Sequence, residues 1–158
     1  MSKVIFLDID GVLNGNFTIE NAPSGCIGID SKHIIILKEI IDKTRAIVIL
    51  TSTWKECFTE DNCNPYTVND NDGAYLIFKL AEYGVYIAGR TIDPDNKIFL
   101  RGGGIRKYLK EHPEVTNYII LDDDIFSDYT DELKDHLFYM EEPLNNINKK
   151  RIIEILNK

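Results

Sequence analysis

The chain has 158 residues, of which 44% are hydrophobic and 28% charged, and its formal net charge is −8. This length predicts a single domain over residues 1–158, and the composition is typical of globular proteins. The negative charge argues against an extended nucleic-acid-binding surface, because such surfaces need clustered Lys and Arg. It leaves open a nucleic-acid end or a nucleotide as a substrate, since a divalent cation can supply positive charge locally.

The cysteines and the apolar runs narrow the protein class further. Three cysteines without a CxxC pair argue against a disulfide framework and against a zinc knuckle. Because the first residues read as an apolar strand without a basic stretch or a small-residue cleavage site, we expect no signal peptide. Because apolar runs stay short of the ~18 residues that a membrane span needs, we expect a cytoplasmic protein without a membrane partner.

Apolar runs and helical patterns alternate along the chain. Strands are expected at 3–8, 46–50, 85–88, 118–121 and 137–140, helices at 33–42, 73–83, 105–112 and 147–156, and loops at 14–30, 60–72 and 89–104. Continuously apolar strands that alternate with helices are typical of a mainly parallel sheet with both faces covered. We therefore predict a three-layer α/β/α sandwich with a Rossmann-like sheet.

Two carboxylates follow the first predicted strand directly. Asp8 and Asp10 stand where the apolar run ends, just before Gly11. Burying charges is costly unless they are paired, protonated or bound to a metal, and open α/β sheets bind ligands at this end of their strands. If the chain is still extended here, both side chains lie on one side of the strand and reach a single cation or substrate group.

Polar groups also follow two other predicted strands, and a basic residue precedes a helix. They are Thr51 and Ser52 after 46–50, Asp122, Asp123 and Asp124 after 118–121, and Arg101 before 105–112. In a parallel sheet these strand ends share one edge. Together they supply a nucleophile, an acid/base, hydroxyl donors, a cation and carboxylates for Mg²⁺, which is what phosphoryl transfer needs.

These motifs resemble a known superfamily. Asp-x-Asp-Gly-Val-Leu at 8–13, the hydroxyls at 51–52, a basic residue and the acidic cluster at 122–124 are similar in order and spacing to the haloacid dehalogenase-like (HAD) phosphohydrolases. Thr-Ser-Thr-Trp-Lys at 51–55, with Arg-Gly-Gly-Gly-Ile at 101–105, more closely resembles the HAD domain of Swiss Army Knife RNA-repair proteins. The resemblance covers most of the chain.

The resemblance implies a role for each motif residue. Asp8 would attack phosphorus and become an aspartyl-phosphate, and Asp10 would protonate the leaving group and then activate water. Mg²⁺ would be held by the backbone carbonyl of Asp10 with the carboxylates of Asp8 and Asp123, and Asp122 would assist or replace Asp123 as a ligand. Thr51 would bind a phosphoryl oxygen.

The cation that contacts the phosphate is less clearly defined by the resemblance. The superfamily more often has Lys there, so Arg101, Arg106 and Lys107 all remain open. We favour Arg101, because the loop before the helix can aim it at the strand ends. Asp124 and Asp128 are also open as residues that orient their neighbours.

Structural roles compete with functional ones at several positions. Ser52 is a second candidate for phosphate binding, although it could equally cap a helix. Trp54 is expected to pack near the site, with substrate stacking as the alternative. The glycines at 102–104 could cradle a phosphate, but a flexible helix start is the favoured interpretation. The acidic stretch 128–135 is expected to be a solvated face.

The segment between the first two motifs reads largely as helix, and the longer segment 54–100 is expected to supply a helix and a strand of the core, so we predict little or no cap over the site. The expected function is a Mg²⁺-dependent phosphatase that acts on a phosphomonoester through an aspartyl-phosphate, on a nucleic-acid end, a nucleotide or another phosphorylated substrate. The alternatives are phosphoryl transfer to an acceptor other than water, and a non-enzymatic phosphate- or metal-binding domain acting through a partner. Asp10 favours catalysis, because binding alone does not need a second carboxylate as an acid/base.

Overall fold

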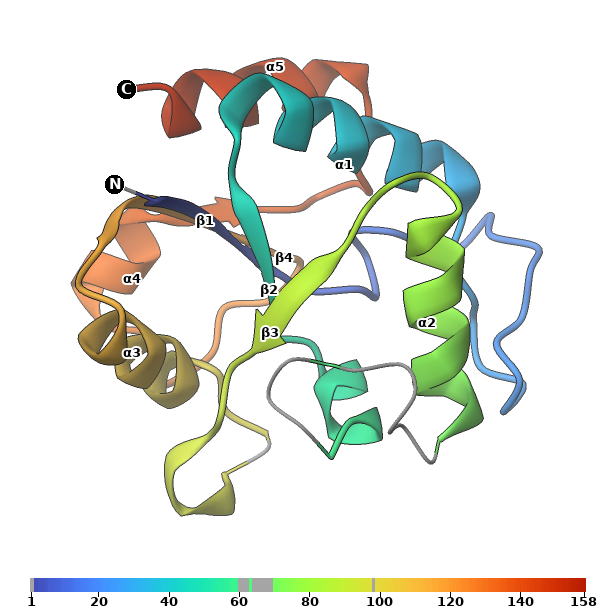
Figure 1. Ribbon diagram of the computed structural model, residues 1–158, viewed down its shortest axis with the longest axis horizontal. Coiled ribbons are helices and arrows are strands. Elements are labelled where there is room, and N and C mark those ends of the chain that lie inside the picture. Colours follow the sequence, from blue (N-terminus) through green and yellow to red (C-terminus); the bar gives the residue numbers. More distant parts are fainter. Residues whose placement is uncertain (1, 60–62, 64–69, 98) are drawn as a thin grey trace.

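Figure 1 shows the computed structural model, which describes residues 2–59, 63, 70–97 and 99–158. Five parallel strands form one sheet in the order β3-β2-β1-β4-β5. The strands are β1 (Ser2–Leu7), β2 (Ile47–Leu50), β3 (Ile87–Arg90), β4 (Val115–Asp122) and β5 (Leu137–Tyr139). The predicted parallel α/β architecture is confirmed.

Helices cover both faces of the sheet. They are α1 (Ser31–Thr44), α2 (Asn71–Ala81), α3 (Gly102–Glu111), α4 (Asp131–Asp135) and α5 (Asn146–Leu156), with short 3-10 helices η1 (Thr53–Cys57) and η2 (Pro94–Asn96). Buried residues of α1, α2 and α5 share one hydrophobic cluster, and those of α3 and α4 share a second cluster. These clusters are the two interlayer cores of an α/β/α sandwich, and Figure 1 shows α1 and α5 side by side on one face.

The alternation of side chains along β1 explains its continuous hydrophobicity. Ile5 and Leu7 belong to the cluster beneath α1, α2 and α5, whereas Val4 and Phe6 belong to the cluster beneath α3 and α4. A strand covered on both faces needs apolar residues at every position. Asp8 continues the series of Val4 and Phe6, so the alternation directs its side chain toward the α3 side.

The segment between the second motif and Arg101 supplies elements of the sandwich. In its described part, α2 buries Leu76 and Leu80 in the core, and β3 pairs with β2. The described residues therefore contain no separate domain over the strand ends, as the prediction of little or no cap requires. The loop predicted at 60–72 lies outside the described residues, except for Cys63 and the start of α2 from its cap Asp70.

Three short helices of the described residues were not predicted: α4, η1, and η2 within the loop expected at 89–104. Helix α4 lies in the acidic stretch expected to be a solvated face, where the Thr130 hydroxyl accepts from the Leu133 backbone N–H at 3.4 Å and Leu133 is buried. Helix η1 follows β2, and β3 begins two residues later than expected. Among the described helices, none combines the length and apolar character that crossing a bilayer requires.

Candidate active site

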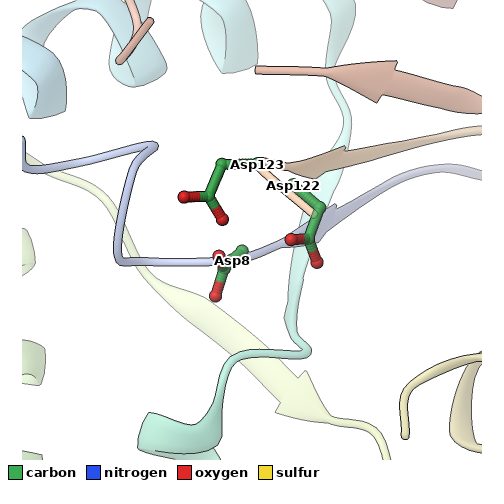
Figure 2. A group of neighbouring side chains, drawn as sticks. All are labelled: Asp8, Asp122 and Asp123. Atoms are coloured by element: carbon green, nitrogen blue, oxygen red, sulfur yellow. The ribbon is translucent and has the colours of Figure 1, made fainter. Parts of the chain in front are cut away.

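Three carboxylates meet at the carboxyl ends of β1 and β4. These strands are neighbours, with Leu7 paired to Leu121, so the residues that follow them come together. Asp8, Asp122 and Asp123 each offer one oxygen, and these oxygens lie within 4.8 Å of one another (Figure 2). The structure thus brings together the two acidic motifs at the edge where the sequence predicted a site.

Arg101 is the cation that contacts this cluster. Its Nη1 lies 3.0 Å from Oδ1 of Asp8 and also donates a hydrogen bond to Oδ2 of Asp122. Arg106 instead donates to the backbone carbonyl of Asp128, and Lys107 lines a hollow beside β3. Of the three basic residues left open by the sequence, Arg101 is therefore the one positioned at the carboxylates.

Asp128 holds the N-terminal turn of α3, from which Arg101 projects. Its carboxylate accepts from the backbone N–H of Gly103 at 2.8 Å and from that of Arg101 at 3.4 Å. A Cβ on Gly102 would come within 2.4 Å of the Asp128 carbonyl oxygen, so glycine permits this close approach. Residues 102–104 are thus a packed first turn bound to a carboxylate, rather than the flexible start that the sequence suggested.

The cluster carries more negative charge than Arg101 offsets. Burial is the main cause that raises the pKa of Asp8 to about 7, with Arg101 opposing this shift and Asp122 adding to it. Burial likewise raises the pKa of Asp122, again against Arg101. Buried carboxylates with raised pKa values gain most from a further positive charge, so a divalent cation would favour their ionised forms.

The donor set fits Mg²⁺, which takes oxygen ligands and keeps several waters. Asp122 already uses both oxygens, since Oδ2 accepts from Arg101 and Oδ1 accepts from the Asp124 backbone N–H at 3.0 Å. Asp8 and Asp123 are therefore the better-placed carboxylates for the ion. At Gly11, where φ is +83°, a Cβ would come within 2.3 Å of Asp123 Oδ2, so the loop backbone closes against this carboxylate.

The hydroxyl residues after β2 have different surroundings. The Thr51 backbone N–H donates to the Leu7 carbonyl at 2.9 Å, while its buried hydroxyl has no hydrogen-bond partner among the described residues. A buried hydroxyl without a partner is unusual and is available to a ligand. The Ser52 hydroxyl accepts from the Trp54 backbone N–H at 3.3 Å and caps η1. Phosphate binding by Ser52 stays a prediction.

Asp10 is not part of the cluster of Asp8, Asp122 and Asp123, and it is exposed. Its Oδ2 accepts from the Trp54 indole N–H at 3.2 Å, and its Oδ1 accepts from the Asn14 side-chain amide at 2.8 Å. Trp54 is buried, as expected for a packing residue, so its ring offers no open face for the alternative of substrate stacking. Sequence reasoning missed Asn14, which lies in an aperiodic loop, and it missed the indole contact with Asp10.

Fold and site together define a class of protein. A parallel sheet with an aspartate pair after β1, hydroxyls after the adjacent β2, an arginine before α3 and aspartates after β4 is a HAD-like arrangement. The chain belongs to the family described as "HAD domain in Swiss Army Knife RNA repair proteins", whose family model matches residues 4–144. No curated protein and no solved structure matches the chain. Membership supports a hydrolase of the phosphatase type in general, in a superfamily that usually uses Mg²⁺.

Proposed function

We propose that this protein is a Mg²⁺-dependent phosphatase that hydrolyses phosphomonoesters through an aspartyl-phosphate on Asp8. The observation that carries the proposal is the surroundings of Asp8, a buried carboxylate next to Arg101, Asp122 and Asp123. Nucleophilic catalysis by a carboxylate requires an ionised oxygen held against the phosphorus. Mg²⁺ held by Asp8 and Asp123 would offset the charge of the carboxylates and of the phosphoryl group.

The first step transfers the phosphoryl group to the enzyme. An oxygen of Asp8 forms a bond to phosphorus while the bond to the leaving oxygen breaks, and Asp10 gives that oxygen a proton. Arg101, which contacts the nucleophile, would also offset the charge of the phosphoryl oxygens, and the Thr51 hydroxyl, which has no partner among the described residues, would donate to one of them. These donors stabilise charge that spreads over the phosphoryl oxygens in the transition state.

The second step regenerates the enzyme. Asp10, now ionised, takes a proton from a water molecule that attacks phosphorus, the bond to Asp8 breaks, and inorganic phosphate leaves. One exposed carboxylate thus acts first as an acid and then as a base. Its exposure matters, because both the leaving oxygen and the attacking water approach from solvent.

The substrate proposed is a nucleic-acid end or a nucleotide. The described residues contain no lid domain over the strand ends, which favours a bulky phosphorylated substrate over a small enclosed one. The family name refers to RNA repair proteins, which favours a nucleic-acid end as the substrate. With a net charge of −8, the protein would bind the phosphorylated terminus locally rather than along an extended strand.

The experiment is hydrolysis of p-nitrophenyl phosphate, with and without Mg²⁺, by the wild-type protein and by Asp8→Asn. We expect Mg²⁺-dependent turnover that Asp8→Asn abolishes. Oligoribonucleotides with a 5′ or a 3′ phosphate, the matching deoxyoligonucleotides and mononucleotides are then compared by kcat/KM. Turnover that persists in Asp8→Asn would contradict the proposed nucleophile.

A binding role without catalysis gives a different result in the same experiment. A non-enzymatic domain would bind Mg²⁺ or phosphate but release no phosphate from any substrate in the set. Calorimetry measures Mg²⁺ binding, which a folded non-enzymatic domain would show and a protein that does not fold would not. If the folded wild-type protein showed neither Mg²⁺ binding nor turnover, the proposed metal site would be wrong as well.

A further inference from the structure

Trp54 and Asn14 each donate a hydrogen bond to the carboxylate of Asp10, one to each oxygen. The indole N–H of Trp54 reaches one oxygen at 3.2 Å, and the side-chain amide of Asn14 reaches the other at 2.8 Å. Two donors on different oxygens restrict rotation of a carboxylate group about its terminal bond. Asp10 is still an exposed residue with both hydrogen bonds in place, so a substrate can approach its side chain.

Each of the two donors is itself fixed by the surrounding structure. The Ser52 hydroxyl accepts from the Trp54 backbone N–H at the start of η1, and the Trp54 ring is buried in the core beneath α1 and α2. The Asn14 amide also donates to the Gly28 carbonyl at 2.9 Å, and its oxygen accepts from the Gly11 N–H at 3.0 Å. Neither donor has to become ordered when substrate binds.

A second anchor holds η1 against the loop after β3. The Lys55 ammonium lies 2.7 Å from Oδ2 of Asp93 and donates to the Thr91 hydroxyl at 3.3 Å, and its side chain is only 1% exposed. The Arg90 guanidinium donates to the Lys55 carbonyl at 3.1 Å. The helix that carries Trp54 is therefore fixed on both sides of the indole.

We infer that Trp54 and Asn14 are positioning residues that hold Asp10 in the orientation needed for proton transfer to the leaving group. This inference rests on the proposed function, in which Asp10 is the acid/base. Proton transfer requires the acid within hydrogen-bond distance of the leaving oxygen, and misplacement of a reacting group by about 1 Å can lower a rate about 100-fold. The buried Trp54 thus acts through Asp10 rather than by stacking on a base.

The test compares Trp54→Phe with the wild-type protein on two aryl phosphates, one with a good leaving group (p-nitrophenyl phosphate) and one with a poor one (phenyl phosphate). A good leaving group departs without much protonation, whereas a poor one depends on the acid. We compare kcat/KM, because it reports the first step, in which the leaving group departs, and excludes the later hydrolysis of the phosphoryl-enzyme that both substrates share. We expect Trp54→Phe to lower kcat/KM about 10-fold or more on phenyl phosphate and much less on p-nitrophenyl phosphate. Asp10→Asn sets the upper limit of this difference.

Phe58→Leu is the matched control, because Phe58 is a buried residue at the end of η1 whose apolar side chain cannot donate a hydrogen bond to Asp10. A packing defect reduces the active fraction and lowers both rates by the same factor. Equal losses on both substrates in Trp54→Phe would overturn the positioning role while leaving the phosphatase proposal intact. Loss of turnover only on phenyl phosphate supports it.

A spectroscopic measurement tests the contact without turnover. Trp54 is the only tryptophan, so the protein labelled with ¹⁵N gives a single indole N–H cross-peak. We expect Asp10→Asn to shift this cross-peak and to speed its exchange with solvent, and we expect no such change in Asp124→Asn. An indole signal unaffected by Asp10→Asn would overturn the contact, whether or not the wild-type protein hydrolyses a phosphate.

Discussion

The buried ion pair between Lys55 and Asp93 makes a quantitative prediction about stability. The two side chains are only 1% and 5% exposed, and Oδ1 of Asp93 has no hydrogen-bond partner among the described residues. Lys55→Met keeps the apolar stem but removes the ammonium, which leaves a buried carboxylate without its partner. Removing one member of a buried pair costs about 3–5 kcal/mol of unfolding free energy. For a domain of this size, that corresponds to a fall in Tm of roughly 6–20 °C.

The assay is urea unfolding followed by circular dichroism, with Lys38→Met as the matched control. Lys38 pairs with Asp42 one helical turn away, and its side chain is 35% exposed, so its loss is expected to cost about 0.5 kcal/mol or less. The double variant Lys55→Met/Asp93→Leu should regain much of the loss, because it no longer buries a lone charge. A Lys55→Met variant that loses no more than Lys38→Met would refute this reasoning.

Three further predictions concern the site. Because the pKa of Asp8 in the folded protein is raised to about 7, the metal-free protein should lose stability as pH rises from about 4 to about 7. Mg²⁺ should therefore raise Tm more at pH 8 than at pH 5, as measured by differential scanning fluorimetry. An effect of Mg²⁺ on Tm that does not change with pH would contradict this prediction. Gly11→Ala places a side chain at φ +83° against Asp123. Calorimetry should show weaker Mg²⁺ binding, and chemical unfolding should show a free energy of unfolding lower by about 1–3 kcal/mol. Wild-type values in both measurements would refute the close approach. Asp128→Ala removes the carboxylate that binds the backbone N–H groups at the start of α3, and it should lower the free energy of unfolding by about 0.5–2 kcal/mol. It should also raise KM, because Arg101 would no longer be held at the carboxylates. An unchanged KM would show that Asp128 does not position Arg101.

Much of the fold could be predicted because its strands are buried on both faces. Continuous apolar runs predicted β1 and β2 to within one residue and the buried end of β4, which begins three residues earlier than expected, at Val115. Parallel pairing followed from the alternation of strands with helices. The β3 prediction was displaced for a physical reason: Val85 is buried and so reads as part of a strand, but pairing with β2 starts at Ile87. Burial and ladder pairing are different properties, and a hydrophobic pattern reports only the first.

The site could be predicted as far as the ends of the strands define it. Parallel topology places Asp8 and Asp122 at one edge, and the order of the motifs supplies the rest. The contact between Trp54 and Asp10 joins residues 44 apart, and it depends on the direction that η1 gives the indole. The hydrogen bonds from the first turn of α3 to the Asp128 carboxylate depend on tertiary packing. The acidic stretch 128–135, which was expected to be solvated, therefore contains a residue that stabilises α3.

The most direct test of the account is to trap the phosphoryl-enzyme. Wild-type protein is mixed with p-nitrophenyl phosphate and Mg²⁺, quenched in acid at successive times, digested and analysed by mass spectrometry. We expect one phosphoryl group on the peptide that contains Asp8, absent in Asp8→Asn and longer-lived in Asp10→Asn, which cannot activate water. Turnover without phosphorylation of Asp8, or phosphorylation of a different residue, would contradict the proposed mechanism.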